Sequence, residues 1–125
     1  MADKTRILII EDEAEMAQAI RLRLEANGYE VLTAADGAEG LNRARAEKPG
    51  LIILDVMLPK MDGFKVSRML KFDENFKDIP IIMLTAKTQK VDVAMGLEAG
   101  VNVYMTKPFK AEELLRTISG LLAKK

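Results

Sequence analysis

The side chains best suited to chemistry in this chain are carboxylates, a hydroxyl and an amine, each at or just after the end of a short apolar run. They are Glu11, Asp12, Asp55, Thr85 and Lys107. Carboxylate and phosphate oxygens are ligands that Mg²⁺ prefers, and a carboxylate can also accept phosphate covalently. If these side chains meet, the sequence predicts a phosphoryl-transfer site with a metal, an acceptor, a hydrogen-bond donor and a neutralising ammonium.

The composition excludes several other kinds of site. The chain of 125 residues contains no Cys, no His and no Trp. It therefore has no disulfide, thiol nucleophile, histidine triad or zinc site of the usual kind. The 19 Lys and Arg balance the 19 Asp and Glu, so a net basic field for nucleic acid is absent. No apolar run has the length of a signal peptide or a membrane span, so we expect a cytoplasmic protein with no membrane or direct nucleic-acid contacts.

Short apolar runs alternate with helical patterns and predict the elements that carry these side chains. Four runs have the length of a strand and are apolar on both faces, which is typical of parallel strands covered by helices on both sides. These runs are 7–10, 51–54, 81–84 and 103–105, and a more polar strand is expected at 29–34. Apolar stripes at helical spacing lie at 16–24, 38–44, 66–70, 93–97 and 114–122.

Local patterns also predict how some residues pack and cap. Met69 belongs to the apolar stripe of the third predicted helix, and Phe72 and Phe76 are expected to anchor an otherwise solvated loop. Asp12 followed three residues later by Glu15 has the spacing of a capping box at the start of the first predicted helix. Asp12 could serve both as this cap and as a metal ligand.

Repeated five times, the strand–helix unit predicts an open, doubly wound α/β fold, (βα)5, with a five-stranded parallel sheet. Right-handed crossovers bring the carboxyl ends of all strands to one edge. In the common strand order 2-1-3-4-5, the four strands that end in the polar side chains are neighbours. Two like charges 4 Å apart repel by about 4 kcal/mol at an effective dielectric near 20, which Lys107 and Mg²⁺ would offset. Asp55, on the central strand, is the predicted nucleophile, with Glu11 and Asp12 as metal ligands.

Four segments resemble the motifs of response-regulator receiver domains, the CheY-like proteins with a flavodoxin-like fold. The segments are Ile9-Ile10-Glu11-Asp12-Glu13, residues 55–63, Leu84-Thr85-Ala86 and residues 104–109. They occur in the order and at the spacing of the family. The resemblance covers nearly the whole chain and implies one receiver domain over residues 1–125.

The resemblance implies a role for each residue of the acidic site. Asp55 would accept phosphate from a histidine kinase or a histidine phosphotransfer protein. Mg²⁺ would be bound by Glu11, Asp12, Asp55 and the backbone carbonyl of Met57. Lys107 would pair with the phosphoryl oxygens.

The resemblance also implies a switch. Thr85 would contact the phosphoryl group, and Thr85 with Tyr104 would couple it to the face formed by the fourth helix, the fifth strand and the fifth helix. The peptide bond before Pro108 is expected to be cis. Met57 and Lys87 would flank the path of hydrolytic water, where neither carries a carboxylate or amide to orient it. We therefore expect slow loss of the phosphoryl group.

These features imply a signalling protein, which catalyses only its own phosphorylation and dephosphorylation and is not otherwise an enzyme. Because the chain ends after the last predicted helix, we expect no DNA-binding output domain. The expected readout is a downstream protein target, with the chain acting as a monomer or as a phosphorylation-dependent dimer.

Three alternatives use related chemistry or the same fold. A phosphatase of the haloacid-dehalogenase type needs a second Asp two residues after the first, where this chain has Met57, and it needs a cap domain. A flavin carrier would bind a phosphate at its first loop, where Glu11-Asp12-Glu13 would repel it. A receiver-like scaffold that no longer accepts phosphate is disfavoured by the complete set of site residues.

Overall fold

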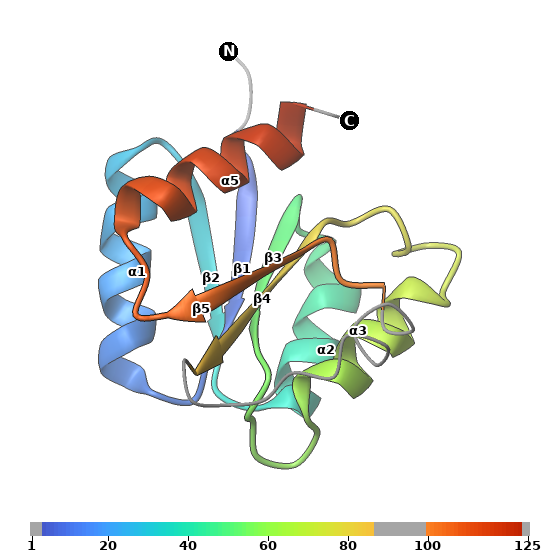
Figure 1. Cartoon of the computed structure of the whole chain (residues 1–125). Coiled ribbons are helices and arrows are strands. Elements are labelled where there is room, and N and C mark those ends of the chain that lie inside the picture. Colours follow the sequence, from blue (N-terminus) through green and yellow to red (C-terminus); the bar gives the residue numbers. More distant parts are fainter. Residues whose placement is uncertain (1–3, 87–99, 124–125) are drawn as a thin grey trace.

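Five strands and four helices make up the part of the chain that the computed structural model describes, residues 4–86 and 100–123 (Figure 1). In chain order these are β1 (Arg6–Ile10), α1 (Ala14–Ala26), β2 (Glu30–Ala34), α2 (Gly37–Glu47), β3 (Leu51–Asp55), α3 (Gly63–Lys71), β4 (Ile81–Ala86), β5 (Val103–Lys107) and α5 (Ala111–Ala123). The strands form one parallel sheet in the order β2-β1-β3-β4-β5. The predicted doubly wound α/β fold is therefore confirmed. The helix predicted around 93–97 lies outside the described residues.

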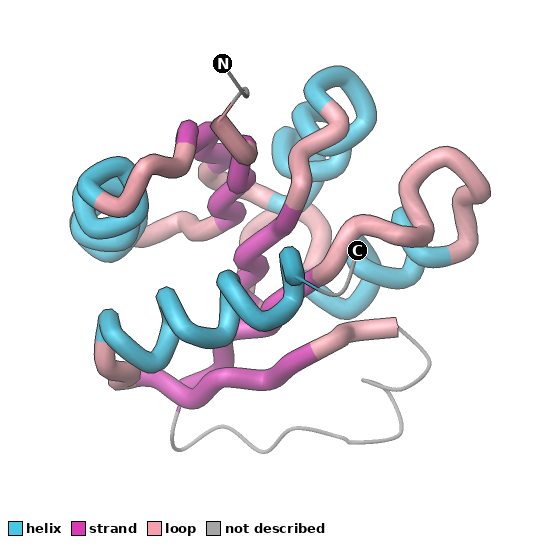
Figure 2. The backbone as a smooth tube through the Cα atoms, turned by 90° about the horizontal axis from the view of Figure 1, so that it is seen from above, coloured by secondary structure: helices cyan, strands magenta, loops and turns pink. Residues whose placement is uncertain are grey.

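The sheet is the middle layer of three, with α1 and α5 on one face and α2 and α3 on the other (Figures 1 and 2). Alternate residues of the strands enter two separate apolar clusters, as the run of apolar residues on both faces predicts. The cluster under α2 and α3 includes Leu8, Ile10, Ile52, Leu54 and Met83. The cluster under α1 and α5 includes Ile7, Ile9, Leu51, Ile53 and Met105. Burial of each of these Ile and Leu side chains contributes about 1.5–3 kcal/mol to the stability of the folded state. The well-packed sheet is therefore a firm support for the side chains at its carboxyl edge.

The prediction that Asp12 caps the first helix is wrong. The helix α1 begins after Glu13, and no side chain among the described residues forms a capping hydrogen bond there. The backbone N–H of Glu13 instead donates to Oε2 of Glu11 at 3.1 Å. The helix thus starts one residue later than a cap at Asp12 requires, because Glu13 and not Asp12 holds the N-cap position.

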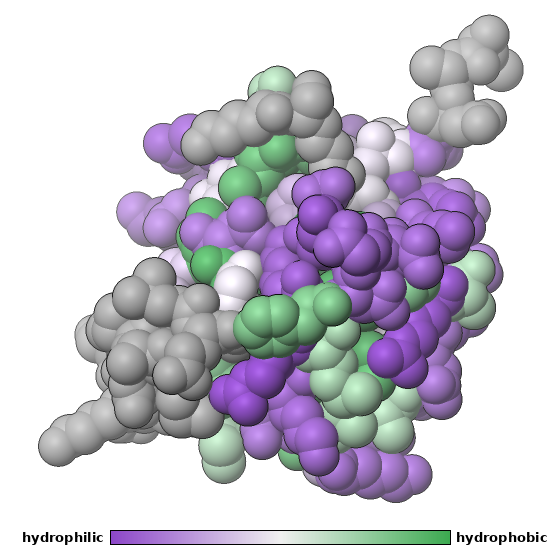
Figure 3. Space-filling view, turned by 90° about the vertical axis from the view of Figure 1, so that its right-hand side faces the viewer, coloured by the Kyte–Doolittle hydropathy of each residue, from purple (hydrophilic) through white to green (hydrophobic). Residues whose placement is uncertain are grey.

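Two apolar side chains that were expected to pack against the protein lie on its surface. Met69 on α3 is 36% exposed and Phe72, just after α3, is 75% exposed, whereas Phe76 is buried as predicted. The reason is the position of α3, which directs Phe64, Val66 and Leu70 to the core and the other side of the helix outward. Apolar side chains appear among polar ones on this side of the molecule (Figure 3).

No helix in the described ranges combines the length and the apolar character that crossing a membrane would require.

Candidate functional site

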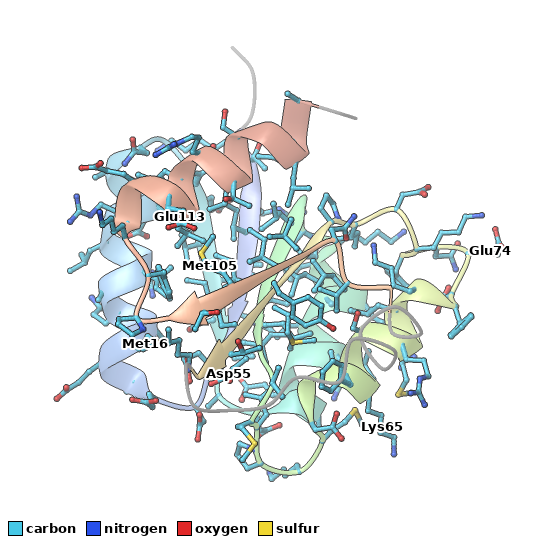
Figure 4. The ribbon with its side chains drawn as sticks, in the orientation of Figure 1. Met16, Asp55, Lys65, Glu74, Met105 and Glu113 are labelled. Atoms are coloured by element: carbon cyan, nitrogen blue, oxygen red, sulfur yellow. The ribbon has the colours of Figure 1, made fainter. Side chains whose placement is uncertain are left out.

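Three acidic side chains come together at the carboxyl edge of the sheet. One oxygen from each of Glu11, Asp12 and Asp55 lies within 4.8 Å of the others. Glu11 follows β1, and Asp55 ends β3, the neighbouring strand. Asp55 is labelled at the lower edge of the sheet in Figure 4. Glu11 and Asp55 are buried, whereas Asp12 is exposed. A cleft of about 290 Å³ between α1 and the start of α2 opens beside Glu11 and Asp12.

Lys107 joins the two buried carboxylates. Its Nζ lies 2.9 Å from Oδ2 of Asp55 and 3.0 Å from Oε1 of Glu11. Burial alone would lower the pKa of Lys107, but the hydrogen bonds to Asp55 and Glu11 outweigh burial and raise its pKa above the ordinary value of 10.5. The ammonium is therefore a fixed positive charge at neutral pH. The peptide bond that follows it, to Pro108, is cis, as expected.

Backbone hydrogen bonds hold the Asp55 carboxylate and the main chain of Glu11 in place. The N–H of Met57 donates to Oδ1 of Asp55 at 3.1 Å, so the two oxygens of Asp55 have different partners, this amide and Lys107. The N–H of Glu11 donates to the carbonyl of Ala34 at 3.0 Å, which extends the pairing of β1 with β2 by one residue. The side chain of Met57 is exposed.

Glu11 holds a proton more tightly than an ordinary Glu. Burial and, next, a hydrogen bond shared with Asp55 raise the pKa of Glu11 from 4.5 to about 7. The hydrogen bonds from Glu13 and Lys107 act in the opposite direction and offset part of this effect. Glu11 and Asp55 share the single positive charge of Lys107, so a second cation would reduce the repulsion between the two carboxylates.

Of the two predicted switch residues, one lies inside and the other at the surface. Thr85 near the end of β4 is buried, and it follows Leu84, the residue that pairs with Asp55 across β3 and β4. Tyr104 on β5 is 37% exposed, and its ring lies 6.5 Å from the ring of Phe64 on α3. Lys87, predicted to tune hydrolysis, lies outside the described residues.

The sequence interpretation missed the part that Asp62 and Gly63 play. Asp62 caps α3 by accepting a hydrogen bond from the N–H of Lys65 at 3.0 Å. The N–H of Gly63 donates to the carbonyl of Val56 at 3.0 Å, and a Cβ on Gly63 would overlap the carbonyl oxygen of Asp55. The first turn of α3 therefore rests on the backbone of Asp55. The available signal was an Asp just before a helical apolar stripe, which is typical of an N-cap.

The β3–α3 loop is also held against the start of α2. The N–H of Gly37 donates to the carbonyl of Pro59 at 3.3 Å, and Lys60 pairs with Asp36 at 3.6 Å. Any side chain at Gly37 would collide with the backbone of Met61. The segment between Asp55 and α3 is thus closed at its ends by the hydrogen bond from Gly63 to Val56 and held in its middle against the start of α2.

The sheet order and the acidic edge define a doubly wound α/β domain with a carboxylate–lysine site at the ends of β1, β3 and β5. The chain belongs to the response regulator receiver domain family, whose sequence profile matches residues 7–119. Its fold is the flavodoxin-like fold of the CheY-like proteins. A receiver domain of a two-component response regulator is therefore the class to which this chain is assigned.

Named relatives agree with this family. The chain is 44% identical over 117 residues to the alkaline phosphatase synthesis transcriptional regulatory protein PhoP of Bacillus subtilis, covering 94% of this chain and 48% of PhoP. The chain thus spans about half the length of the curated relatives it matches. A CheY-like receiver domain protein from Methanospirillum hungatei superposes with a TM-score of 0.90 at 30% identity, covering 97% of this chain and 95% of that one. The receiver domain of the sensor histidine kinase PA1611 from Pseudomonas aeruginosa, with a magnesium ion in its active site cleft, superposes with a TM-score of 0.88 at 34% identity, covering 96% and 98%.

Proposed function

We propose that this chain is a Mg²⁺-dependent phosphorylation switch in which Asp55 accepts a phosphoryl group from a partner's histidine. The partner would be a histidine kinase or a histidine phosphotransfer protein. The observation that carries the proposal is the buried Asp55 carboxylate, held between the Lys107 ammonium and the Met57 amide and beside two further carboxylates. Family membership supports the same reaction class.

The donor set fits Mg²⁺ because it consists of oxygens alone and lies open on one side to a cleft. Glu11, Asp12 and Asp55, with the backbone carbonyl of Met57, would hold the ion. When bound, the ion would neutralise the charge of the transferring phosphoryl group. The magnesium in the cleft of the PA1611 receiver domain supports this choice of metal.

The residues of the chain account for the transfer step. An oxygen of Asp55 attacks phosphorus, the bond between phosphorus and the partner's imidazole nitrogen breaks, and the imidazole leaves with that electron pair. The Lys107 ammonium neutralises charge on the phosphoryl oxygens, and the Thr85 hydroxyl donates a hydrogen bond to one of them. The chain would catalyse only its own phosphorylation and its own dephosphorylation, in which water attacks phosphorus, the Asp55 carboxylate leaves and inorganic phosphate is released, and Met57 and Lys87 would make this hydrolysis slow.

The output would pass through Thr85 and Tyr104 to a face that includes β5 and α5, and a downstream protein would bind there. The proposal allows two forms of this binding: a monomer that binds a different protein, and a phosphorylation-dependent dimer in which the partner is a second copy of the chain. The prediction that the chain does not contact nucleic acid stays a prediction, since relatives such as PhoP are about twice as long. The cytoplasmic location stays a prediction as well.

Incubation with Mg²⁺ and acetyl phosphate is expected to add one phosphoryl group, seen by mass spectrometry and removed by hydroxylamine. The variant Asp55→Asn should form no adduct, because an amide is not a nucleophile of this kind. Asp78→Asn, an exposed Asp outside the site, is the matched control and should react as the unsubstituted chain does. An adduct that persists in Asp55→Asn would contradict the proposal, and a complete lack of reaction would favour the scaffold alternative.

The stabilising effect of Mg²⁺ is expected to grow as the pH rises from 5.5 to 7.5. The folded-state pKa of Glu11, about 7, lies above its ordinary value of 4.5, so the protonated form favours the folded state. That contribution is present below about pH 4.5 and is lost as the pH rises through about 7. Mg²⁺ binds the deprotonated carboxylate, so its apparent affinity should increase about tenfold or more over this range.

Thermal unfolding with and without Mg²⁺ across this pH range measures the effect. Glu11→Gln has no proton to release, so its Mg²⁺-induced shift in melting temperature should be small and nearly independent of pH. A shift in the unsubstituted chain that is equal at pH 5.5 and pH 7.5 would show that Glu11 is not the titrating group.

A further inference from the structure

The ring of Tyr104 on β5 packs against the ring of Phe64 on α3. The ring centroids are 6.5 Å apart and the ring planes are inclined by 54°, an arrangement within the range of favourable aromatic pairs. Phe64 is 7% exposed and Tyr104 is 37% exposed. The buried ring of Phe64 is therefore a fixed surface on which the half-exposed ring of Tyr104 rests.

Phe64 is also connected to the backbone of Asp55. It is the second residue of α3, and the residue before it, Gly63, donates to the carbonyl of Val56 at 3.0 Å and lies against the carbonyl of Asp55. The cap formed by Asp62 fixes this first turn. The Asp55 backbone, the first turn of α3 and the two rings thus form a continuous series of contacts.

The contact through α3 joins two residues whose side chains lie on opposite faces of the sheet, because side chains alternate along each strand. On β3, the side chain of Asp55 lies on the same face of the sheet as that of Ile53, which packs under α1 and α5. On β5, Met105 packs under α1 and α5 as well (Figure 4), so the side chain of its neighbour Tyr104 points to the other face of the sheet. Asp55 and Tyr104 therefore belong to opposite faces of the sheet. The first turn of α3, which follows Asp55 in the chain, brings Phe64 to the face of Tyr104.

We propose that Phe64 is a positioning residue for Tyr104 and couples the state of Asp55 to the aromatic ring on β5. The inference rests on the proposed function of Asp55. Phosphorylation adds negative charge and bulk next to a backbone that the first turn of α3 touches. A shift of that turn moves the Phe64 ring and changes the surface on which Tyr104 rests, which alters the face offered to a partner.

Tyrosine fluorescence can test this coupling. The chain contains two Tyr and no Trp, so Tyr29→Phe leaves Tyr104 as the one tyrosine reporter. In that background, Phe64→Leu is compared with Phe76→Leu, because Phe76 is also 7% exposed and belongs to the same apolar cluster. Acrylamide quenching of Tyr104 is measured before and after treatment with Mg²⁺ and acetyl phosphate, and the Asp55 adduct is measured separately by mass.

With Phe64→Leu, quenching of Tyr104 in the unmodified protein is expected to rise about twofold or more, since the ring loses its support. The change on phosphorylation should fall to less than half, while the yield of adduct stays the same. Phe76→Leu should leave both quenching values unchanged. Equal quenching in the two Leu variants, with a normal adduct, would overturn the inference, whereas a missing adduct in the Tyr29→Phe parent would contradict the proposed function itself.

If Phe64→Leu does not fold, ring-to-ring nuclear Overhauser effects in the unsubstituted chain decide the matter. Effects between Phe64 and Tyr104 that change on phosphorylation support the coupling, and effects that stay the same overturn it.

Discussion

Replacing Lys107 by Ala is expected to slow phosphoryl transfer to Asp55 by about 10²–10³-fold while Mg²⁺ binds more tightly. The rate should fall because the ammonium, 2.9 Å from Oδ2 of Asp55, is the group proposed to neutralise charge that develops on the phosphoryl oxygens. Affinity for Mg²⁺ rises by roughly tenfold because a positive charge that competes for the same carboxylates is removed. A simple loss of folding would lower both quantities, so the opposite signs identify an electrostatic role.

The same variant should also lose stability when Mg²⁺ is absent. Lys107 contacts two carboxylates whose side chains are 0% and 6% exposed, and its removal leaves them without this partner. The expected cost is about 1–3 kcal/mol of unfolding free energy, limited because one carboxyl group can take up a proton. Lys110→Ala, an exposed Lys three residues further on, is the matched control. Adduct formation followed by mass, Mg²⁺ titration and urea unfolding measure the three effects, and a normal transfer rate in Lys107→Ala would refute the assigned role.

The strand ends could be placed from the sequence because they depend on a pattern that repeats. Apolar runs on both faces require helices on both sides of a sheet, and parallel strands must then end at one edge. Glu11, Asp55 and Lys107, which follow or end three of these strands, must therefore lie at the same edge. The order β2-β1-β3-β4-β5, predicted because it is common for this fold, is the order in the structure.

The errors in the sequence interpretation concern contacts that no periodic pattern encodes. Asp12 has a capping spacing, but the helix begins at Ala14 with Glu13 in the N-cap position, one residue later than the spacing predicts. Met69 belongs to an apolar stripe and Phe72 was expected to anchor a loop, but both lie exposed beside the face of α3 that packs on the core. The face that α3 turns to the core depends on tertiary contacts such as the close approach of Gly63 to the backbone of Asp55.

This close approach has consequences for stability that a substitution can measure. Gly63→Ala is expected to lower the unfolding free energy by about 1–3 kcal/mol, because the new Cβ would overlap the carbonyl of Asp55 and lie 3.0 Å from Cα of Val56. Neither atom belongs to a flexible side chain, so relief requires α3 or the end of β3 to move. Because the end of β3 carries Asp55, the proposed phosphate acceptor, the rate of adduct formation should fall as well.

The chain offers a control of opposite sign. Gly120 lies in α5, and a Cβ there would meet no atom within 4 Å, so Gly120→Ala should raise the unfolding free energy by up to about 1 kcal/mol through helix propensity. The transfer rate of this variant should match that of the unsubstituted chain. Denaturant unfolding and the adduct assay compare the two substitutions directly. If Gly63→Ala were as stable and as reactive as Gly120→Ala, the first turn of α3 would not support Asp55, and the route from Asp55 to Phe64 and Tyr104 would lose its first contact.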